Sequence, residues 1–157
     1  MPFTRPRKLS KDISTSASAL KHALIECEKI FNKKFDYVVE LMATNPLKSV
    51  IDINSIINIL LKNNADSVIA VNQLFDHHPA RIKKIVKGKI FDFSVKERLE
   101  SRRQDLKPNA YVRSGSIYAM SRRFVMDEKR YFSGKSFAYI LPLTVSYTHL
   151  TLPTMLM

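Results

Sequence analysis

The sequence is poor in the residues that build tight phosphate loops, disulfides and membrane anchors. Its 157 residues include only 3 glycines and 1 cysteine. With so few glycines (Gly88, Gly115 and Gly134), a glycine-rich phosphate-binding loop is absent from this chain. The lone cysteine, Cys27, permits no internal disulfide and fits a reducing compartment, which indicates the cytoplasm. No apolar run approaches the ~20 residues of a membrane span, and the basic start lacks the apolar core of a secretory signal.

Acidic residues are also scarce. The chain has 14 Asp and Glu against 26 Lys and Arg, a formal net charge of +12. Such an excess is typical of nucleic-acid surfaces, so a small basic nucleic-acid-binding or interaction module without catalysis is one hypothesis. The cations are spread along the chain, however, and no nucleic-acid motif accompanies them. The other interpretation is that an acidic part of the protein is missing from this sequence.

What is present is the patterning of a single globular α/β domain. The chain is 45% hydrophobic and 25% charged, which favours a packed core over disorder. Apolar spacing predicts helices and strands in alternation, including a right-handed βαβ unit. The predicted helices cover 17–31, about 49–62 and 121–128, and the predicted strands cover 37–42, 67–71, 110–120 and 137–141. The strand at 37–42 is mostly apolar, as expected of a buried parallel strand.

Side-chain spacing also predicts which helical residues face the core. The second helix has an apolar stripe made of Ile53, Ile56, Ile57, Leu60 and Leu61. In the first helix Cys27 lies on the stripe, so we interpret it as a core residue, with a reactive thiol as the alternative. His22 lies off the stripe and is expected to be solvated.

Two segments between the strands carry turn signals. The β-prone stretches 82–86 and 89–93 flank Lys87 and Gly88, which is a compact hairpin signal. Just before them, His77 and His78 could suggest a metal site. No cysteine or further histidine lies at ligand spacing, so the sequence favours a role without metal.

The most informative segment is the run of Arg102, Arg103 and Gln104 before a β-prone stretch. A guanidinium can grip a carboxylate or phosphate with two parallel hydrogen bonds. A neighbouring amide adds a donor and an acceptor. On an extended backbone, the three side chains would suit an anionic ligand that also carries hydroxyls or amides. A solvated basic edge strand is the alternative. Gly115, inside the strand that follows, predicts a bulge or a close approach to a ligand.

The order of strands and loops points to a second part of the site. In open α/β sheets, ligands bind beyond the carboxyl ends of the strands. Thr44, Asn45 and Lys48 follow the predicted strand at 37–42, so we expect them at the edge of the site.

These motifs together resemble a known enzyme family. RRQDLKP, then Tyr111 and SGSIYAM, resemble the RRQDL…Y…NG-(A/S)-IY signature of the acylneuraminate cytidylyltransferases. MATNPLK resembles the family segment Q-x-T-(S/N)-P-L-R, and the first twelve residues resemble FxRPxxLxxD. Three positions depart from the pattern, with Met42 for glutamine, Lys48 for arginine and Ser114 for asparagine. A thioether cannot replace the hydrogen bonds of an amide, so Met42 bears on the sugar preference or on the activity itself.

The resemblance implies a fold and a reaction. The fold would be a partial Rossmann-like sheet of the nucleotide-diphospho-sugar transferase type, with helices on its faces and a β-hairpin dimerisation arm at about 82–108. The reaction would transfer CMP from CTP to a nine-carbon sugar acid of the sialic, legionaminic or pseudaminic type, releasing pyrophosphate. The sugar hydroxyl would attack the α-phosphorus, so no protein nucleophile is needed. The partners would be CTP, the sugar acid and a second copy of the chain, with no nucleic acid and no membrane.

The resemblance also assigns roles to particular residues. Those implied to bind the sugar acid are Arg102, Arg103, Gln104, Thr44 and Asn45. Arg5 and Ser16 are implied to bind the nucleotide. Without the resemblance, Arg5 would be interpreted as a surface arginine near the terminus.

Finally, the resemblance predicts what the chain lacks. The Mg²⁺ of the family is held by carboxylates in a (D/N)-I-D segment, which this sequence does not contain. We therefore expect residues 1–143 to be a partial cytidylyltransferase domain that is inactive alone. Residues 144–157 read as a non-native tail of the kind produced by a translated adapter. A poorly folding fragment with unpaired strand edges is a further alternative.

Overall fold

The computed structural model describes residues 2–74, 77–96, 102–127, 132 and 134–142, so the tail at 144–157 and part of the expected arm lie outside the described residues. All seven helices and strands predicted outside the hairpin are present, with small shifts in their ends. In chain order the elements are η1 (Arg7–Leu9), α1 (Ser16–Ile30), β1 (Tyr37–Leu41), α2 (Val50–Lys62), β2 (Ser67–Leu74), η2 (Pro79–Arg81), β3 (Lys83–Val86), β4 (Lys89–Asp92), η3 (Arg103–Asp105), β5 (Ala110–Ser121), α3 (Arg122–Met126) and β6 (Ser136–Ile140).

The main sheet is mixed, with the strand order β1-β5-β2-β6. The long strand β5 pairs antiparallel with both β1 and β2, and β6 pairs parallel with β2. Strands β1 and β2 therefore run in the same direction, as a βαβ unit requires, but β5 lies between them. The prediction of a buried parallel strand at 37–42 is wrong. Its ends, Tyr37 and Leu41, are 41% and 46% exposed, because among the described residues β1 has a neighbour on one side only.

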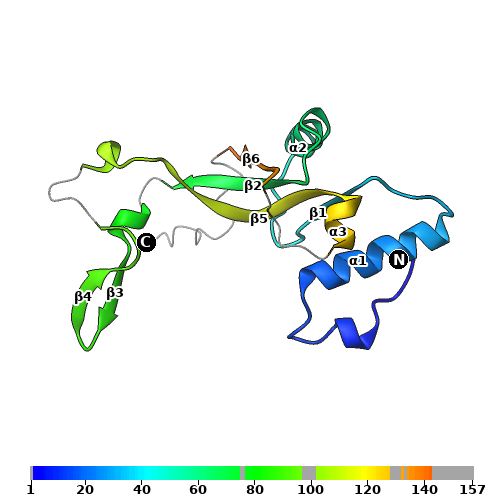
Figure 1. Ribbon diagram of the computed structural model, residues 1–157, viewed down its shortest axis with the longest axis horizontal. Helices are drawn as coiled ribbons and strands as arrows, with labels where there is room; N and C mark the ends of the chain where they lie inside the picture. The colour runs from blue at the N-terminus through cyan, green and yellow to red at the C-terminus, as the bar shows by residue number, and fades with distance from the viewer. Residues whose placement is uncertain (1, 75–76, 97–101, 128–131, 133, 143–157) are drawn as a thin grey trace, which may run out of the picture.

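Helices cover both faces of this sheet (Figure 1). Successive residues of β5 point to opposite faces, as the pleat of a strand dictates. Ile117 and Ala119 join a core cluster with α2. Tyr118 and Met120 join a second cluster with α1 and α3. The fold is thus a three-layer α/β arrangement, consistent with the predicted partial Rossmann-like class.

Residues that commonly cap helices lie at the ends of α1 and α2. Thr15 is the N-cap of α1, and its side chain accepts a hydrogen bond from the Ser18 backbone N–H. Ser49 and Asp52 form a reciprocal capping box at the start of α2. After α2, Asn64 adopts a positive φ of 44°, the left-handed backbone that commonly ends a helix.

The buried stripe of α2 is narrower than predicted. Ile56 and Leu60 are fully buried, but Leu61 is 48% exposed. Adjacent helical positions are about 100° apart, and only one side of α2 contacts the sheet, so Leu61 points away from it. In α1, Cys27 is half-buried. The expectation that His22 is solvated is wrong, because its ring packs edge-on against Phe3 with centroids 5.7 Å apart.

Gly115 marks an irregularity in β5, as predicted. The pairing runs Ile69 with Tyr118 and then shifts to Val71 with Arg113. Gly115 has a φ of +66°, a conformation that residues with a Cβ rarely adopt. The strand therefore changes register at the point where it leaves the core.

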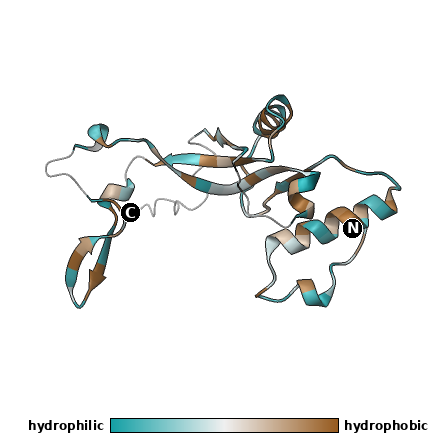
Figure 2. Cartoon of the chain, viewed as in Figure 1, coloured by the Kyte–Doolittle hydropathy of each residue, from teal (hydrophilic) through white to brown (hydrophobic). Residues whose placement is uncertain are grey.

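The hairpin formed by β3 and β4 stands away from the main sheet (Figure 1). Lys87 and Gly88 have φ values of 50° and 76°, the backbone that a two-residue hairpin turn favours. Both strands contain hydrophobic residues, coloured brown in Figure 2. Ile85 is 76% exposed and Ile90 is 70% exposed. No helix in the described part of the chain is long and apolar enough to cross a membrane.

An ion pair between Glu28 and Arg122 joins α1 to the start of α3. The Arg122 guanidinium donates two hydrogen bonds to the Glu28 carboxylate, at 2.8 and 3.0 Å. The Phe35 backbone N–H donates a further bond to the same carboxylate, at 3.2 Å. The bonds from Arg122, chiefly, lower the pKa of Glu28 to about 2.

We expect Glu28→Gln to lower the unfolding temperature at pH 7, because it removes the charge that Arg122 requires. The pKa of Glu28 is depressed from 4.5 to about 2 in the folded state. Its stabilisation is therefore full above about pH 4.5 and is lost as the pH falls towards 2. Thermal unfolding of both proteins between pH 2 and pH 7 should show a difference that narrows below pH 4.5.

The matched control is Glu26→Gln on the same helix. Glu26 pairs with Lys29 at 2.8 Å, but the Lys29 side chain is 66% exposed. Water screens an exposed pair, so the control should change the unfolding temperature much less. Equal effects of the two substitutions would contradict a specific role for the Glu28–Arg122 pair.

Candidate functional site

Hydrogen bonds hold the loop after β1 together and attach it to the irregular part of β5. The Lys48 ammonium donates to the Met42 carbonyl at 2.7 Å and also to the Asn45 carbonyl. The Met42 backbone N–H donates to the Ser116 carbonyl at 3.0 Å. This loop, residues 42–48, therefore lies beside Gly115 at the carboxyl end of β1. Lys48 was predicted to lie at the edge of the site, and the structure shows its charge holding the loop.

Buried side-chain amide oxygens without hydrogen-bond partners lie near the carboxyl ends of both β1 and β2. Asn45 is 5% exposed and Asn72 is 8% exposed. The side-chain carbonyl oxygen of each is buried with no hydrogen-bond partner among the described residues. A buried acceptor without a partner is costly, so each marks a place for a further polar contact. Thr44, next to Asn45, is exposed in the turn.

A cavity of about 240 Å³ lies where β2 ends and β5 begins. Leu74 pairs with Ala110 at this point. The cavity receives Gln104 from η3, so one of the predicted sugar-binding residues lies beside the carboxyl end of a strand. The lining residues are Gln73, Leu74, His78, Gln104, Leu106, Asn109 and Ala110.

The backbone around Gln104 differs from the prediction. The structure places Arg103, Gln104 and Asp105 in the 3₁₀ turn η3, so the expectation of an extended chain is wrong. The Asp105 backbone N–H donates to the Arg102 carbonyl at 3.0 Å, and the Arg102 guanidinium donates to the Asp105 carboxylate at 2.7 Å. Asp105 therefore bonds to Arg102 twice, once through its backbone and once through its side chain. The Arg102 side chain remains 73% exposed, and the side chain of Arg103 lies outside the described residues.

The residues predicted to bind the nucleotide lie elsewhere. Arg5 donates from its Nε to the Ser10 hydroxyl at 3.2 Å, and Ser16 is the first residue of α1. Helix α1 and the turn η3 lie at opposite ends of the longest axis of the chain (Figure 1). A single chain thus does not bring the predicted nucleotide residues together with Gln104.

His78 connects two loops beside the Gln104 cavity. It is 8% exposed, and its Nε2 lies 2.9 Å from the Pro108 carbonyl. The Ala80 backbone N–H donates to Nδ1 at 3.3 Å. Because Nδ1 accepts, Nε2 carries the hydrogen that is donated to Pro108. Both ring nitrogens of His78 are therefore used in hydrogen bonds within the protein. The described residues contain no group of three or more His, Cys, Asp or Glu that could hold a metal ion.

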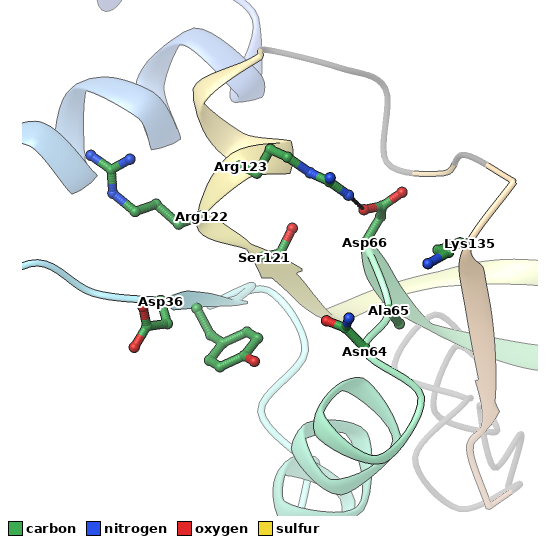
Figure 3. A pocket seen from close by; sticks show the side chains of 9 residues that line it. Asp36, Asn64, Ala65, Asp66, Ser121, Arg122, Arg123 and Lys135 are labelled. Atoms are coloured by element: carbon green, nitrogen blue, oxygen red, sulfur yellow. Dashed lines mark hydrogen bonds and ion pairs between the residues drawn. The ribbon is translucent and has the colours of Figure 1, made fainter.

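A second cavity, of about 370 Å³, lies at the opposite edge of the sheet (Figure 3). Within it the Arg123 guanidinium lies 2.6 Å from the Asp66 carboxylate. Backbone bonds from Asp66 to Lys135 and from Ser121 to Asp66 join the walls, at 3.1 and 2.9 Å. Ligands in open α/β sheets bind at the carboxyl ends of parallel strands, and this cavity lies at their amino ends. We interpret it as a structural junction.

Sequence reasoning missed Gln73 and Asn109. Gln73 interrupts the apolar run of β2 near its carboxyl end, a signal that could have identified it. Asn109 lies in the loop before β5, and only the fold brings it to the same cavity.

Comparison with known proteins supports the sequence resemblance. No protein-family model matches the chain. The chain is similar to two kinds of curated protein, an N-acylneuraminate cytidylyltransferase and a post-translational flagellin modification protein. Over 136 residues it is 29% identical to the N-acylneuraminate cytidylyltransferase of Streptococcus agalactiae serotype III. Over 150 residues it is 24% identical to the post-translational flagellin modification protein B of Campylobacter coli.

These similarities extend over most of this chain but over only part of each relative. The cytidylyltransferase alignment covers 86% of the chain and 31% of the relative. The flagellin modification alignment covers 92% of the chain and 60% of the relative. The predicted resemblance to the acylneuraminate cytidylyltransferases is therefore confirmed as a similarity at modest identity.

Two substitutions at His78 should distinguish the contributions of its two hydrogen bonds. Asparagine places an acceptor near the position of Nδ1, whereas glutamine places a donor near the position of Nε2. We expect His78→Asn to lose the bond to Pro108 and His78→Gln to keep it. Loss of one net hydrogen bond, about 1 kcal/mol, should speed local amide exchange about fivefold.

Hydrogen exchange at residues 104–111 measures the difference between these variants. His78→Asn should show faster exchange there than His78→Gln, while the two unfold at similar temperatures. Equal acceleration in both variants would indicate that ring packing, and not the bond to Pro108, holds the two loops together.

Proposed function

We propose that this chain is part of a cytidylyltransferase that transfers CMP from CTP to a nine-carbon sugar acid of the sialic, legionaminic or pseudaminic type. The observation that carries the proposal is the position of Gln104. This residue belongs to the motif that resembles the family signature, and it lines a cavity at the carboxyl end of β2. The similarity to an N-acylneuraminate cytidylyltransferase over 86% of the chain supports the same reaction.

In the proposed reaction the anomeric hydroxyl oxygen of the sugar acid attacks the α-phosphorus of CTP. The new P–O bond forms as the bond to pyrophosphate breaks, and the proton of the hydroxyl passes to solvent. The protein supplies position and charge, and no residue becomes covalently attached. The exposed guanidinium of Arg102 suits the carboxylate of the sugar acid, and Gln104 suits its neutral polar groups.

The magnesium ion expected for such a reaction does not fit the residues of this chain. The described residues contain no cluster of three or more potential ligands, and the acidic segment expected of the family is absent from the sequence. We therefore assign no step of the reaction to a metal held here. We propose that residues 1–157 alone do not catalyse the transfer of CMP. We also propose that the protein acts in the cytoplasm.

Binding and turnover can be tested separately. We expect residues 1–157 to bind N-acetylneuraminic acid, detected by ligand-observed NMR titration, but to release no pyrophosphate with CTP and magnesium. Arg102→Ala should weaken binding by roughly tenfold or more, as expected for the loss of a charge-assisted hydrogen bond. Arg7→Ala, which removes another exposed arginine, is the control and should leave the affinity unchanged.

Two results would contradict the proposal. One is an equal loss of affinity in both arginine variants. The other is salt-dependent binding to DNA or RNA without any binding of CTP or the sugar acid, which would favour the alternative of a basic nucleic-acid-binding module.

We also propose that the hairpin and the following loop, residues 82–108, form an arm that contacts a second copy of the chain. The support is its exposed apolar surface. On β3, β4 and the adjacent residues, Ile85, Ile90 and Phe93 are 76%, 70% and 61% exposed. Apolar side chains at this density on a hairpin that stands away from the sheet are typical of a protein contact.

Analytical ultracentrifugation can test this contact with two matched variants. Ile85→Lys should shift the protein from dimer towards monomer, because a charge would be buried in the contact. Ile51→Lys is the control, since Ile51 on α2 is 75% exposed and lies outside the arm. A dimer that resists Ile85→Lys, or that dissociates equally in both variants, would contradict the proposal.

A further inference from the structure

Backbone hydrogen bonds fix the walls of the cavity of about 370 Å³ at the amino ends of the strands. The Ser121 N–H donates to the Asp66 carbonyl at 2.9 Å, and the Asp66 N–H donates to the Lys135 carbonyl at 3.1 Å. The Arg122 N–H donates to the Asp36 carbonyl at 2.7 Å. The bonds that make this region a structural junction therefore also form a cavity in advance of any ligand. Such a cavity loses less free energy to ordering when a ligand binds.

Three side chains bring hydrogen-bond donors to this cavity from different elements (Figure 3). Arg123 comes from α3, Asn64 from the turn after α2, and Lys135 from the residue before β6. A guanidinium has five N–H donors, and the bond from Arg123 to Asp66 uses only Nη2. The Arg123 side chain is 76% exposed, so its other nitrogens are accessible to a ligand. No hydrogen bond joins the Asn64 carboxamide to another described residue.

The charges that face the cavity favour an anion. Figure 3 shows Arg123 and Lys135 on either side of Asp66, so two cations face one carboxylate. The side chains of Arg122 and Asp36 point away from the centre of the cavity in the same view. The chain as a whole carries a formal net charge of +12, which attracts anions to its surface.

The number of donor side chains favours a phosphate monoester among the possible anions. A phosphate group has three strongly accepting oxygens, one for each of the three donor side chains. A guanidinium can also grip two phosphate oxygens with parallel hydrogen bonds. A carboxylate has only two oxygens, so it would leave one of the three donor side chains without an oxygen of its own.

The rest of the cavity suits a sugar attached to the phosphate. Its volume of about 370 Å³ lies within the roughly 300–1,000 Å³ of pockets that enclose a small ligand. Tyr37 lines the cavity and is 41% exposed, so its ring offers an apolar surface to the C–H groups of a sugar. The Asp66 carboxylate can accept hydrogen bonds from sugar hydroxyls.

We propose that this cavity binds a small sugar phosphate, with the phosphate held by Arg123, Asn64 and Lys135. The cavity lies at the amino ends of the parallel strands, whereas the substrates of the proposed reaction are expected at their carboxyl ends. It is therefore a second ligand site, and the inference does not rest on the proposed function.

An NMR titration of residues 1–157 at constant ionic strength can locate the site without any substitution. Glucose 6-phosphate should shift the backbone amides of residues 64–66, 121–123 and 135. Glucose, which lacks the phosphate, should not shift them. Inorganic phosphate should shift the same amides but bind at least threefold more weakly, because it makes no contact with Tyr37.

Two substitutions remove donors from the cavity. Arg123→Gln should weaken the binding of glucose 6-phosphate about tenfold, as expected for the loss of a charge-assisted hydrogen bond. Asn64→Gly should weaken it about threefold, because glycine keeps the positive φ of 44° and removes only the carboxamide. Arg7→Gln is the control, since it removes the charge of an exposed arginine outside the cavity and should leave the affinity unchanged. Circular dichroism establishes that each variant is folded.

Three results would overturn the inference. The first is a set of shifts spread over the surface or confined to the Gln104 cavity. The second is an equal loss of affinity in Arg123→Gln and Arg7→Gln, which would indicate attraction to the net charge alone. The third is equal affinity for inorganic phosphate and glucose 6-phosphate, which would exclude recognition of the sugar. None of these results bears on the binding of CTP or the sugar acid, so the proposed function is tested separately.

Discussion

The structure depends on the change of register in β5 at Gly115. On one side of it, residues 117–121 lie between β1 and β2 and supply the centre of both core clusters. On the other side, residues 110–113 pair with the end of β2, beyond the core. Only a residue that accepts a φ of +66° without strain allows this change. One strand thus serves as the central element of the core and as the wall of the Gln104 cavity.

This arrangement explains why polar groups collect at one edge of the sheet. The loop after β1 is anchored to the Ser116 carbonyl, and the loop after η3 is anchored by His78. Both anchors lie at carboxyl ends of strands that run in the same direction. The amino ends of these strands also border a cavity, in which the Arg123 guanidinium pairs with the Asp66 carboxylate. The carboxyl ends are distinguished by the buried side-chain oxygens of Asn45 and Asn72, which have no hydrogen-bond partner among the described residues.

Much of the fold could be predicted from local sequence signals, and the site only in part. Capping residues, positive-φ asparagine and the Lys87–Gly88 turn act over a few residues, so the sequence alone reveals them. The neighbour of β1 could not be predicted, because the partner strand β5 begins about seventy residues later, and a strand carries no signal of its partner. The turn at Gln104 was mispredicted because the Asp105 side chain closes it locally. Gln73 and Asn109 meet only through that same long-range pairing.

The separation of the two predicted halves of the site has a structural consequence. Under the proposed function, Ser16 and Gln104 serve one reaction, in which the sugar hydroxyl must approach the α-phosphorus to within about 3–3.5 Å. In one chain α1 and η3 lie at opposite ends of the longest axis (Figure 1). The hairpin with its exposed apolar strands lies at the same end as η3. The apolar arm and the cavity that Gln104 lines therefore lie at the same end of the chain, away from the residues predicted to bind the nucleotide.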